Sequence, residues 1–191
     1  MQNDWQKAEN VLKQGGIAIV PTDTLYGIVG SAFDKKAVER IYKVRGRNKN
    51  KPCVVLISSI KDLDKFGIKH SNILQNVRMF LNKKVSVILQ VLSDKFKYLH
   101  RGKKSLAFRL ITPRNKNLFN ILQTVGPLIA PSANPEGLEP AKNRKQARVY
   151  FGKTVDSYVC SGTKIGKAST IVDYTKTKPK VVRQGSVMII F

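Results

Sequence analysis

The chain has few cysteines and no long apolar run. Its two cysteines, Cys53 and Cys160, lie far apart and match no metal-binding spacing, so the sequence predicts neither a disulfide framework nor a zinc site. We expect both to be small buried residues in a reducing compartment. No segment approaches the roughly 20 apolar residues of a membrane span, and the N-terminal MQNDWQKAEN lacks the apolar core of a signal peptide. We therefore expect a cytoplasmic protein without membrane contact.

Several catalytic motifs are missing too. There is no Walker A loop and no G-x-G-x-x-G segment. The two histidines, His70 and His100, fall in segments that we expect to be loops, and no Ser-His-Asp or Cys-His set is apparent. The sequence thus argues against an acid–base hydrolase and against a metal held by protein ligands. It favours a phosphate-binding protein that works by positioning and charge.

Acidic residues are scarce: 12 Asp and Glu stand against 35 Lys and Arg, a formal net charge of +23. Such a charge attracts polyanions, including nucleic acid, nucleotides and anionic surfaces. A host whose proteins are all basic would give the same balance. Charge alone predicts no base or sequence preference, because attraction to phosphate does not depend on sequence.

Helical and strand patterns alternate along the chain, which favours an α/β fold in one domain spanning residues 1–191. Helices are predicted from Asp4, Asp34, Ser59 and Ser71, and over residues 117–124 and 143–151. Strands are predicted over residues 17–20, 53–57, 85–91, 106–111, 127–131, 155–159, 170–174 and 181–183, and a last apolar segment follows at residues 187–190. Several successive strands are too close together for a helix between them, so we expect a mixed sheet.

The segment IAIVPTDTLYG, residues 17–27, is the most informative single stretch. Its four apolar residues predict a strand buried on both faces, which Pro21 should end. Thr22, Asp23 and Thr24 follow directly, and would present hydroxyls and a carboxylate where open α/β sheets bind ligands. The alternative is a turn whose side chains bond their own backbone. Taken alone, the segment favours the turn.

A basic loop over residues 45–52 precedes the predicted strand 53–57. Arg45, Arg47, Lys49 and Lys51 alternate in it, so an extended loop would point all four side chains the same way. Arginine suits bidentate binding of phosphate oxygens, and lysine acts as a point charge. A solvated basic loop with no ligand explains the pattern equally well.

Three later segments share this chemistry. Ser132 and Asn134, in PSANPEG, could bond phosphate or sugar oxygens or form a self-contained Asx turn. Ser169 begins one strand, and Arg183, soon followed by a glycine, ends another. Arg109 lies inside an apolar strand, where arginine is rarely buried unless it is paired or bound to an anion. We expect a functional role for Arg109.

Together these segments resemble the YrdC-type threonylcarbamoyl-AMP synthases. Five of them occur in that family's order and approximate spacing, from about residue 15 to about residue 185: PTDTLYGIVG, RGRNKNKP, PSANPEG, STIVD and VRQGSV. Any one is a weak signal, but five in order are specific. The resemblance implies a twisted mixed β-sheet, flanked by helices, around a positively charged concave cavity.

The resemblance also implies a reaction and its partners. Family members make threonylcarbamoyl-AMP from L-threonine, bicarbonate or CO₂, and ATP, with release of pyrophosphate. A separate tRNA threonylcarbamoyltransferase complex then transfers the threonylcarbamoyl group to adenosine in tRNA. Mg²⁺ would be held mainly through the ATP phosphates, with few protein ligands. No residue stands out as a general base; substrate phosphates or bicarbonate could take the proton.

Residue by residue, the resemblance assigns two groups of side chains. The ATP-binding residues are Arg45, Arg47, Lys49, Ser132, Asn134 and Arg183, of which Arg45 and Arg47 are the catalytic cations. The threonine-binding residues are Thr22, Arg109 and Ser169. Arg45 replaces the family's usual lysine and Asp23 its usual glutamate; arginine keeps the charge but changes its geometry.

A non-enzymatic module of the same fold that binds structured RNA or tRNA is the alternative. The charge of +23 supports it. The sequence lacks the aromatic stacking motifs common in proteins that bind single strands.

Overall fold

The computed structural model describes residues 3–68, 77, 80 and 83–191. The helices are α1 (Asp4–Lys13), α2 (Lys35–Arg45), α4 (Lys97–His100), α5 (Lys116–Val125) and α6 (Arg144–Phe151), with short 3-10 helices η1 (Ile60–Phe66), η2 (Asp94–Phe96) and η3 (Gly152–Thr154). The strands are β1 (Ala18–Pro21), β2 (Tyr26–Ser31), β3 (Val54–Ile57), β4 (Val85–Gln90), β5 (Ser105–Leu110), β6 (Leu128–Ile129), β7 (Ser157–Tyr158), β8 (Thr170–Asp173) and β9 (Lys180–Arg183). The helix predicted from Ser71 lies mostly outside the described residues.

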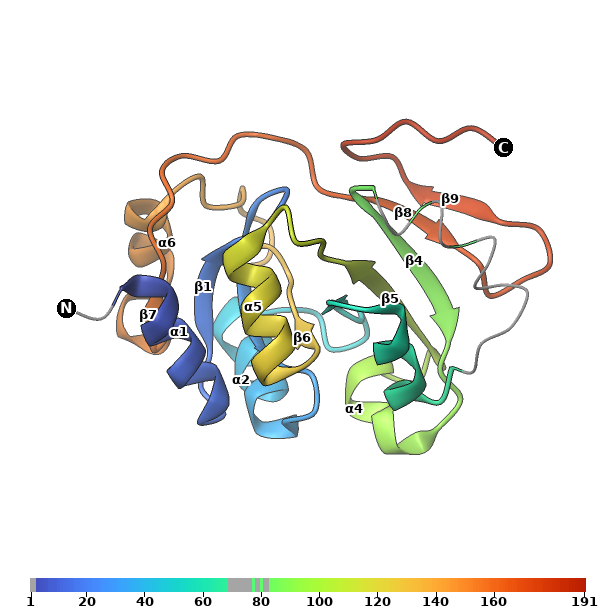
Figure 1. Ribbon diagram of the computed structural model, residues 1–191, viewed down its shortest axis with the longest axis horizontal. Coiled ribbons are helices and arrows are strands. Elements are labelled where there is room, and N and C mark those ends of the chain that lie inside the picture. Colours follow the sequence, from blue (N-terminus) through green and yellow to red (C-terminus); the bar gives the residue numbers. More distant parts are fainter. Residues whose placement is uncertain (1–2, 69–76, 78–79, 81–82) are drawn as a thin grey trace.

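The strands just given join into one sheet of order β7-β1-β2-β6-β3-β5-β4-β8-β9. Parallel pairs are β1 with β7, β3 with β5 and β4 with β8, and the other neighbours are antiparallel. The prediction of a mixed α/β sheet flanked by helices is confirmed. β8 and β9 lie at the end of the sheet opposite β7, and residues 160–168 cross from one end to the other (Figure 1).

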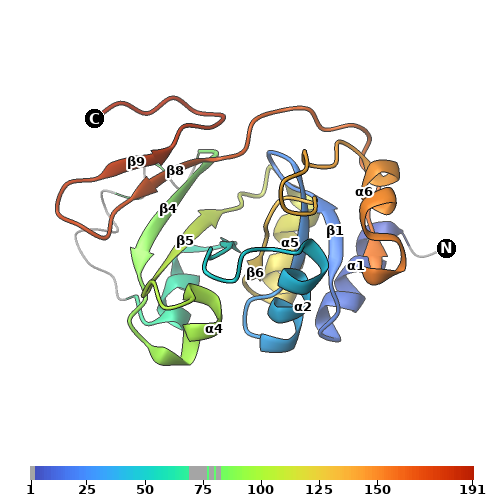
Figure 2. The same ribbon diagram turned by 180° about the vertical axis from the view of Figure 1, so that it is seen from behind.

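Two hydrophobic cores lie on opposite faces of the sheet. Alternate residues of a strand point to opposite faces, so Ala18 and Val20 join the core that contains Leu12 of α1 and residues of α5. Ile19 joins the other core, with Ile41 of α2. Helices α1 and α5 are nearest the viewer in Figure 1, and α2 is nearest in Figure 2. The prediction that residues 17–20 are buried on both faces is confirmed.

The helix ends largely follow the predicted capping signals. Asp34 caps α2 as expected, since its carboxylate accepts from two backbone N–H groups of the first turn. Gly46 ends that helix in the left-handed conformation, at φ 60°. The cap of α1 was placed one residue too late, because Asn3, and not Asp4, accepts from the third N–H of the helix.

Some local predictions were wrong. The sequence reading missed strand β2, which pairs with β1 through the turn at residues 22–25. His100 lies buried in α4 and not in a loop, and Cys160 is exposed, unlike buried Cys53. Within the described ranges, no helix is long and apolar enough to cross a membrane.

Candidate functional site

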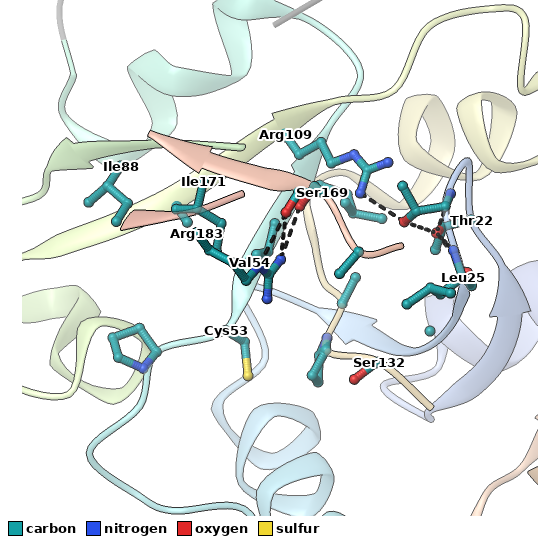
Figure 3. Close-up of a pocket in the computed structure, with 18 of the residues that line it drawn as sticks. Thr22, Leu25, Cys53, Val54, Ile88, Arg109, Ser132, Ser169, Ile171 and Arg183 are labelled. Atoms are coloured by element: carbon teal, nitrogen blue, oxygen red, sulfur yellow. Dashed lines mark hydrogen bonds between the residues drawn. The ribbon is translucent and has the colours of Figure 1, made fainter. Parts of the chain in front are cut away.

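A cavity of about 460 Å³ lies where the β1–β2 turn, β3, β5, β8 and β9 meet. Six of the nine predicted site residues line it: Thr22, Arg47, Arg109, Ser132, Ser169 and Arg183. The other three predicted residues, Arg45, Lys49 and Asn134, are not among the lining residues. Figure 3 shows Arg183 between an apolar side with Ile88 and Ile171 and a polar side with Arg109, Thr22 and Ser132.

Arg109 forms one end of the cavity and is paired with a carboxylate. Its side chain is 5% exposed and forms an ion pair with Asp23. The Nη1 of Arg109 also donates to the hydroxyl of Thr24 at 3.1 Å. The pairing explains how an arginine is tolerated inside β5. The sequence reading assigned no site role to Asp23 or Thr24. Both side chains contact Arg109 at the site.

The hydroxyl of Thr22 is engaged in its own turn. It donates to the carbonyl of Leu25 at 2.7 Å and accepts from the N–H groups of Thr24 and Leu25, at 3.2 and 3.3 Å. This is the self-bonded turn that the sequence left open as an alternative. Thr22 still lines the cavity, so both readings of the segment hold in part.

The Ser-Ala-Asn turn lies beside this hairpin. Gly27 of β2 forms a bridge with Ser132, and the N–H of Ala133 donates to the carbonyl of Tyr26 at 2.9 Å. These backbone bonds bring two segments more than 100 residues apart onto one wall of the cavity. Two motifs that are separate in the sequence, the Thr-Asp-Thr turn and the Ser-Ala-Asn turn, are therefore joined by backbone pairing into one polar wall of the cavity.

Arg45 is the last residue of α2, and not a loop residue as predicted. Its side chain is buried and binds the Ser-Ala-Asn turn: Nε donates to the carbonyl of Asn134 at 2.8 Å, and Nη2 to Oδ1 of Asn134 at 3.2 Å. Burial lowers the pKa of the Arg45 guanidinium, and the charge of Arg47 lowers it further. Arg45 thus ties α2 to the turn that carries Ser132.

The basic loop does not form the predicted row of parallel cations. Lys51 pairs with Glu136 at 3.1 Å, and the N–H of Asn48 also donates to the Glu136 carboxylate. Arg47 donates to the carbonyls of Lys51 and Pro52, at 3.2 and 3.0 Å. The helical end of α2 and the turn at Gly46 break the extended geometry that the alternation assumed. Of the four predicted cations, Arg47 is the one that lines the cavity.

Arg183 is held over the cavity by Ser169, the residue just before β8. Its Nη2 donates to the carbonyl of Ser169 at 2.8 Å, and the hydroxyls of Ser169 and Ser86 lie 2.9 Å apart. Burial lowers the pKa of the Arg183 guanidinium, and the charges of Arg109 and Arg47 lower it further. Three guanidinium groups therefore share one cavity, a geometry suited to phosphate and carboxylate oxygens.

Sequence reasoning missed several lining residues besides Thr24, among them Cys53, Lys103 and Ser105. A signal existed for one of them. Ser105, Ala107 and Arg109 line the cavity with the period of two that β5 imposes, so Arg109 marked the face on which Ser105 lies.

The described part of the chain contains no group of three or more His, Cys, Asp or Glu side chains that could hold a metal ion. The carboxylate of Asp23, which lies in sequence between the lining residues Thr22 and Thr24, is engaged with Arg109.

The family model described as "Telomere recombination", for Sua5, YciO and YrdC proteins, matches residues 10–185. A relative from Mycobacterium tuberculosis, provisionally named a threonylcarbamoyl-AMP synthase, is 32% identical over 185 residues, covering 94% of this chain and 83% of the relative. The threonylcarbamoyl-AMP synthase of Pyrococcus abyssi is 27% identical over 185 residues, covering 93% of this chain and 53% of the relative.

Solved structures agree on the fold. P. abyssi Sua5 complexed with L-threonine superimposes with a TM-score of 0.85 at 24% identity, covering 96% of this chain and 55% of that protein. Escherichia coli YciO superimposes with a TM-score of 0.80 at 23% identity, covering 95% of this chain and 88% of that protein. The chain spans about half the length of the P. abyssi protein.

Proposed function

The chain belongs to the Sua5–YciO–YrdC family, and on that premise we propose that it is a threonylcarbamoyl-AMP synthase. It joins L-threonine, bicarbonate or CO₂, and ATP, and releases pyrophosphate. As a nucleotidyltransferase it transfers the adenylyl group of ATP. The observation that carries the proposal is the convergence of Arg47, Arg109 and Arg183 with the hydroxyls of Ser132 and Ser169 on one cavity.

In the proposed reaction the threonine amine first captures carbon dioxide or bicarbonate as a carbamate. A carbamate oxygen then attacks the α-phosphorus of ATP, and the bond from that phosphorus to the bridging oxygen of pyrophosphate breaks. Carbamates are labile in water, so the cavity must hold the reactants together and exclude solvent. Arg47 and Arg183 stabilise the negative charge that builds on the phosphates. With carbon dioxide, the proton lost by the amine passes to a phosphate oxygen of the substrate; with bicarbonate, carbamate formation releases a water molecule.

The nine predicted residues divide by position in this proposal. Arg47, Ser132 and Arg183 contact the nucleotide directly. Arg45 and Asn134 serve it by holding the turn of Ser132 in place. Lys49, an exposed residue of the basic loop, adds to the local positive field. Arg109, Ser169 and the turn of Thr22 form the threonine end. Mg²⁺ fits the proposal as an ion bound to the ATP phosphates, where it neutralises their charge.

The proposed context is the modification of tRNA. The product would pass to a tRNA threonylcarbamoyltransferase complex, and structured RNA or tRNA is a partner that the charge of +23 would attract. We also propose that the chain acts as one domain, since a single sheet contains both its first and its last strand.

Pyrophosphate release tests the activity. The purified protein, given ATP, L-threonine and bicarbonate with Mg²⁺, is expected to release pyrophosphate only when threonine is present. Leaving out threonine and leaving out bicarbonate are the matched controls. Release that is independent of threonine, or none at all, would overturn the proposal.

A structured-RNA-binding module remains the second candidate, because the net charge favours it independently of the cavity. It predicts tight RNA binding that weakens steeply with salt, without turnover of ATP. Combined with a negative pyrophosphate assay, that result would make RNA binding the function.

A further inference from the structure

The turn that precedes β5 is unusual in its backbone and in its charge. Arg101 and Lys104 have φ of 52° and 51°, and they are the non-glycine residues with positive φ in the described part of the chain. Gly102 between them has φ 81°. A left-handed conformation is unfavourable for a non-glycine residue, and such strained residues gather at functional sites. Lys103, in the middle of this turn, lines the cavity.

The turn is held firmly in place. The N–H of Lys103 donates to the carbonyl of His100 at 2.8 Å, and the carbonyl of Lys104 accepts from the N–H of Val91 at 2.8 Å. The Arg101 guanidinium lies 3.9 Å from the ring centre of Tyr42 in α2. Lys103 is therefore carried by a fixed backbone at the rim of the cavity, and not by a free loop.

The sheet brings this turn beside the basic loop. β3 and β5 are parallel and Val54 pairs with Ala107, so the residues before Val54 lie beside the residues before Ala107. Tyr42 contacts both segments, because its hydroxyl donates to the carbonyl of Lys51 at 2.8 Å while Arg101 lies over its ring. Lys103 and Arg47 thus belong to the same end of the cavity.

Arg109 belongs to the other end. It is four residues beyond Ser105, the first residue of β5, about 13 Å in an extended strand, and it is engaged with Asp23. The face of β5 between them carries Ser105 and Ala107, which have no charge. Positive charge along the strand is thus divided between one end with Arg47 and Lys103 and one end with Arg109.

We propose that Lys103 binds the β- and γ-phosphates of ATP and holds the pyrophosphate that leaves. The proposal rests on the function given above, in which the bond between the α-phosphorus and the bridging oxygen breaks and its electron pair stays on that oxygen. The leaving group gains one negative charge in this step. An ammonium fixed beside it stabilises the transition state more than the ground state.

Calorimetric titrations of MgATP, AMP and inorganic pyrophosphate test the assignment. The variant is Lys103→Met, and Lys104→Met is the matched control, because Lys104 is an exposed neighbour in the same turn that does not line the cavity. Both remove one charge from one turn. We expect Lys103→Met to weaken MgATP and pyrophosphate binding about tenfold, the loss of one charge-assisted hydrogen bond. AMP binding should change less than about twofold, since AMP lacks the terminal phosphates.

Each outcome decides one question. If the wild-type protein binds no MgATP, the proposed function fails. If the wild-type protein binds MgATP but the two variants lose the same affinity, Lys103 contributes only to the general field and the assignment fails. An equal loss of AMP and MgATP affinity in Lys103→Met would also overturn it, because the contact would then lie at the α-phosphate or nucleoside. Circular dichroism establishes that both variants are folded.

Discussion

Gly185, just after β9, lies against the backbone of Ala168 and Ser169, just before β8. A methyl group built there would lie 2.2 Å from the carbonyl oxygen of Ala168 and 2.5 and 2.6 Å from the carbonyl carbon and oxygen of Ser169. Normal carbon contacts are about 3.5 Å, so Gly185→Ala forces the end of β9 away from the start of β8 by about 1 Å. All three neighbours are backbone atoms, so no side-chain rotation relieves the clash.

The expected cost follows from the bonds at this junction. Gly185 N–H donates to Oγ1 of Thr170, and Ser186 N–H to the carbonyl of Ala168, each at 2.9 Å. Overpacking costs about 1–3 kcal/mol, and each lost hydrogen bond about 1 kcal/mol. We expect Gly185→Ala to lower the free energy of unfolding by about 2–4 kcal/mol, or Tm by about 10 °C for a chain of this size.

Urea unfolding followed by circular dichroism measures this change. Gly166→Ala is the matched control: its new methyl group would lie 3.7 Å from the nearest heavy atom, the carbonyl oxygen of Thr24, so we expect a change within about 0.5 kcal/mol. Because Ser169 and Arg183 line the cavity, Gly185→Ala should also weaken nucleotide binding. Equal stability of the two variants would refute the close approach of β8 and β9 described here.

Three further predictions concern charged groups. Arg47→Ala should weaken MgATP binding about tenfold or more in a calorimetric titration, whereas Lys49→Ala, which removes a charge outside the cavity, should change it far less. Asp23→Asn leaves a buried guanidinium without its carboxylate, and should cost about 2 kcal/mol in urea unfolding, less than a fully buried pair because Asp23 is 24% exposed. Burial raises the pKa of the Asp156 carboxyl, but bonds from Arg40 and a backbone N–H outweigh it and lower the pKa overall. Stability from Asp156 is therefore present above the ordinary carboxyl pKa and lost as the pH falls, and Asp156→Asn should flatten the acid limb of a Tm–pH profile.

Sequence patterns predicted most helices and strands well, because hydrophobic periodicity and helix caps are local signals. The strand at residues 17–20, the cap at Asp34 and the class of the sheet all follow from neighbours along the chain. β2 was missed because its residues, YGIVGS, continue a polar turn without a break and contain two glycines. The turn chemistry of residues 22–25 became clear only from the pairing of β1 with β2.

The site was predicted in its residue types more than in its geometry. The alternation of Arg45 and Arg47 was read as one face of an extended loop, but the first residue ends a helix and points to Asn134. The residues around Arg45 do not show where α2 ends, because the same sequence would also fit a helix that ended one residue earlier. Lys103 was missed for the opposite reason: it is one of many lysines, and only strand register places it beside the basic loop.

The cations of the cavity are held in two different ways, and the proposed reaction uses that difference. Arg47 and Arg183 are bound by neutral carbonyl and hydroxyl oxygens, so their full positive charge faces the cavity. Arg109 is paired with a carboxylate, so the other end is nearly neutral but strongly polar. A polyphosphate gains most beside unpaired guanidinium groups. A zwitterionic amino acid gains most beside a fixed pair of opposite charges, with its carboxylate near Arg109 and its ammonium near Asp23. For the proposed reaction we therefore expect one orientation of the two substrates, with the phosphates toward Arg47 and threonine toward Arg109.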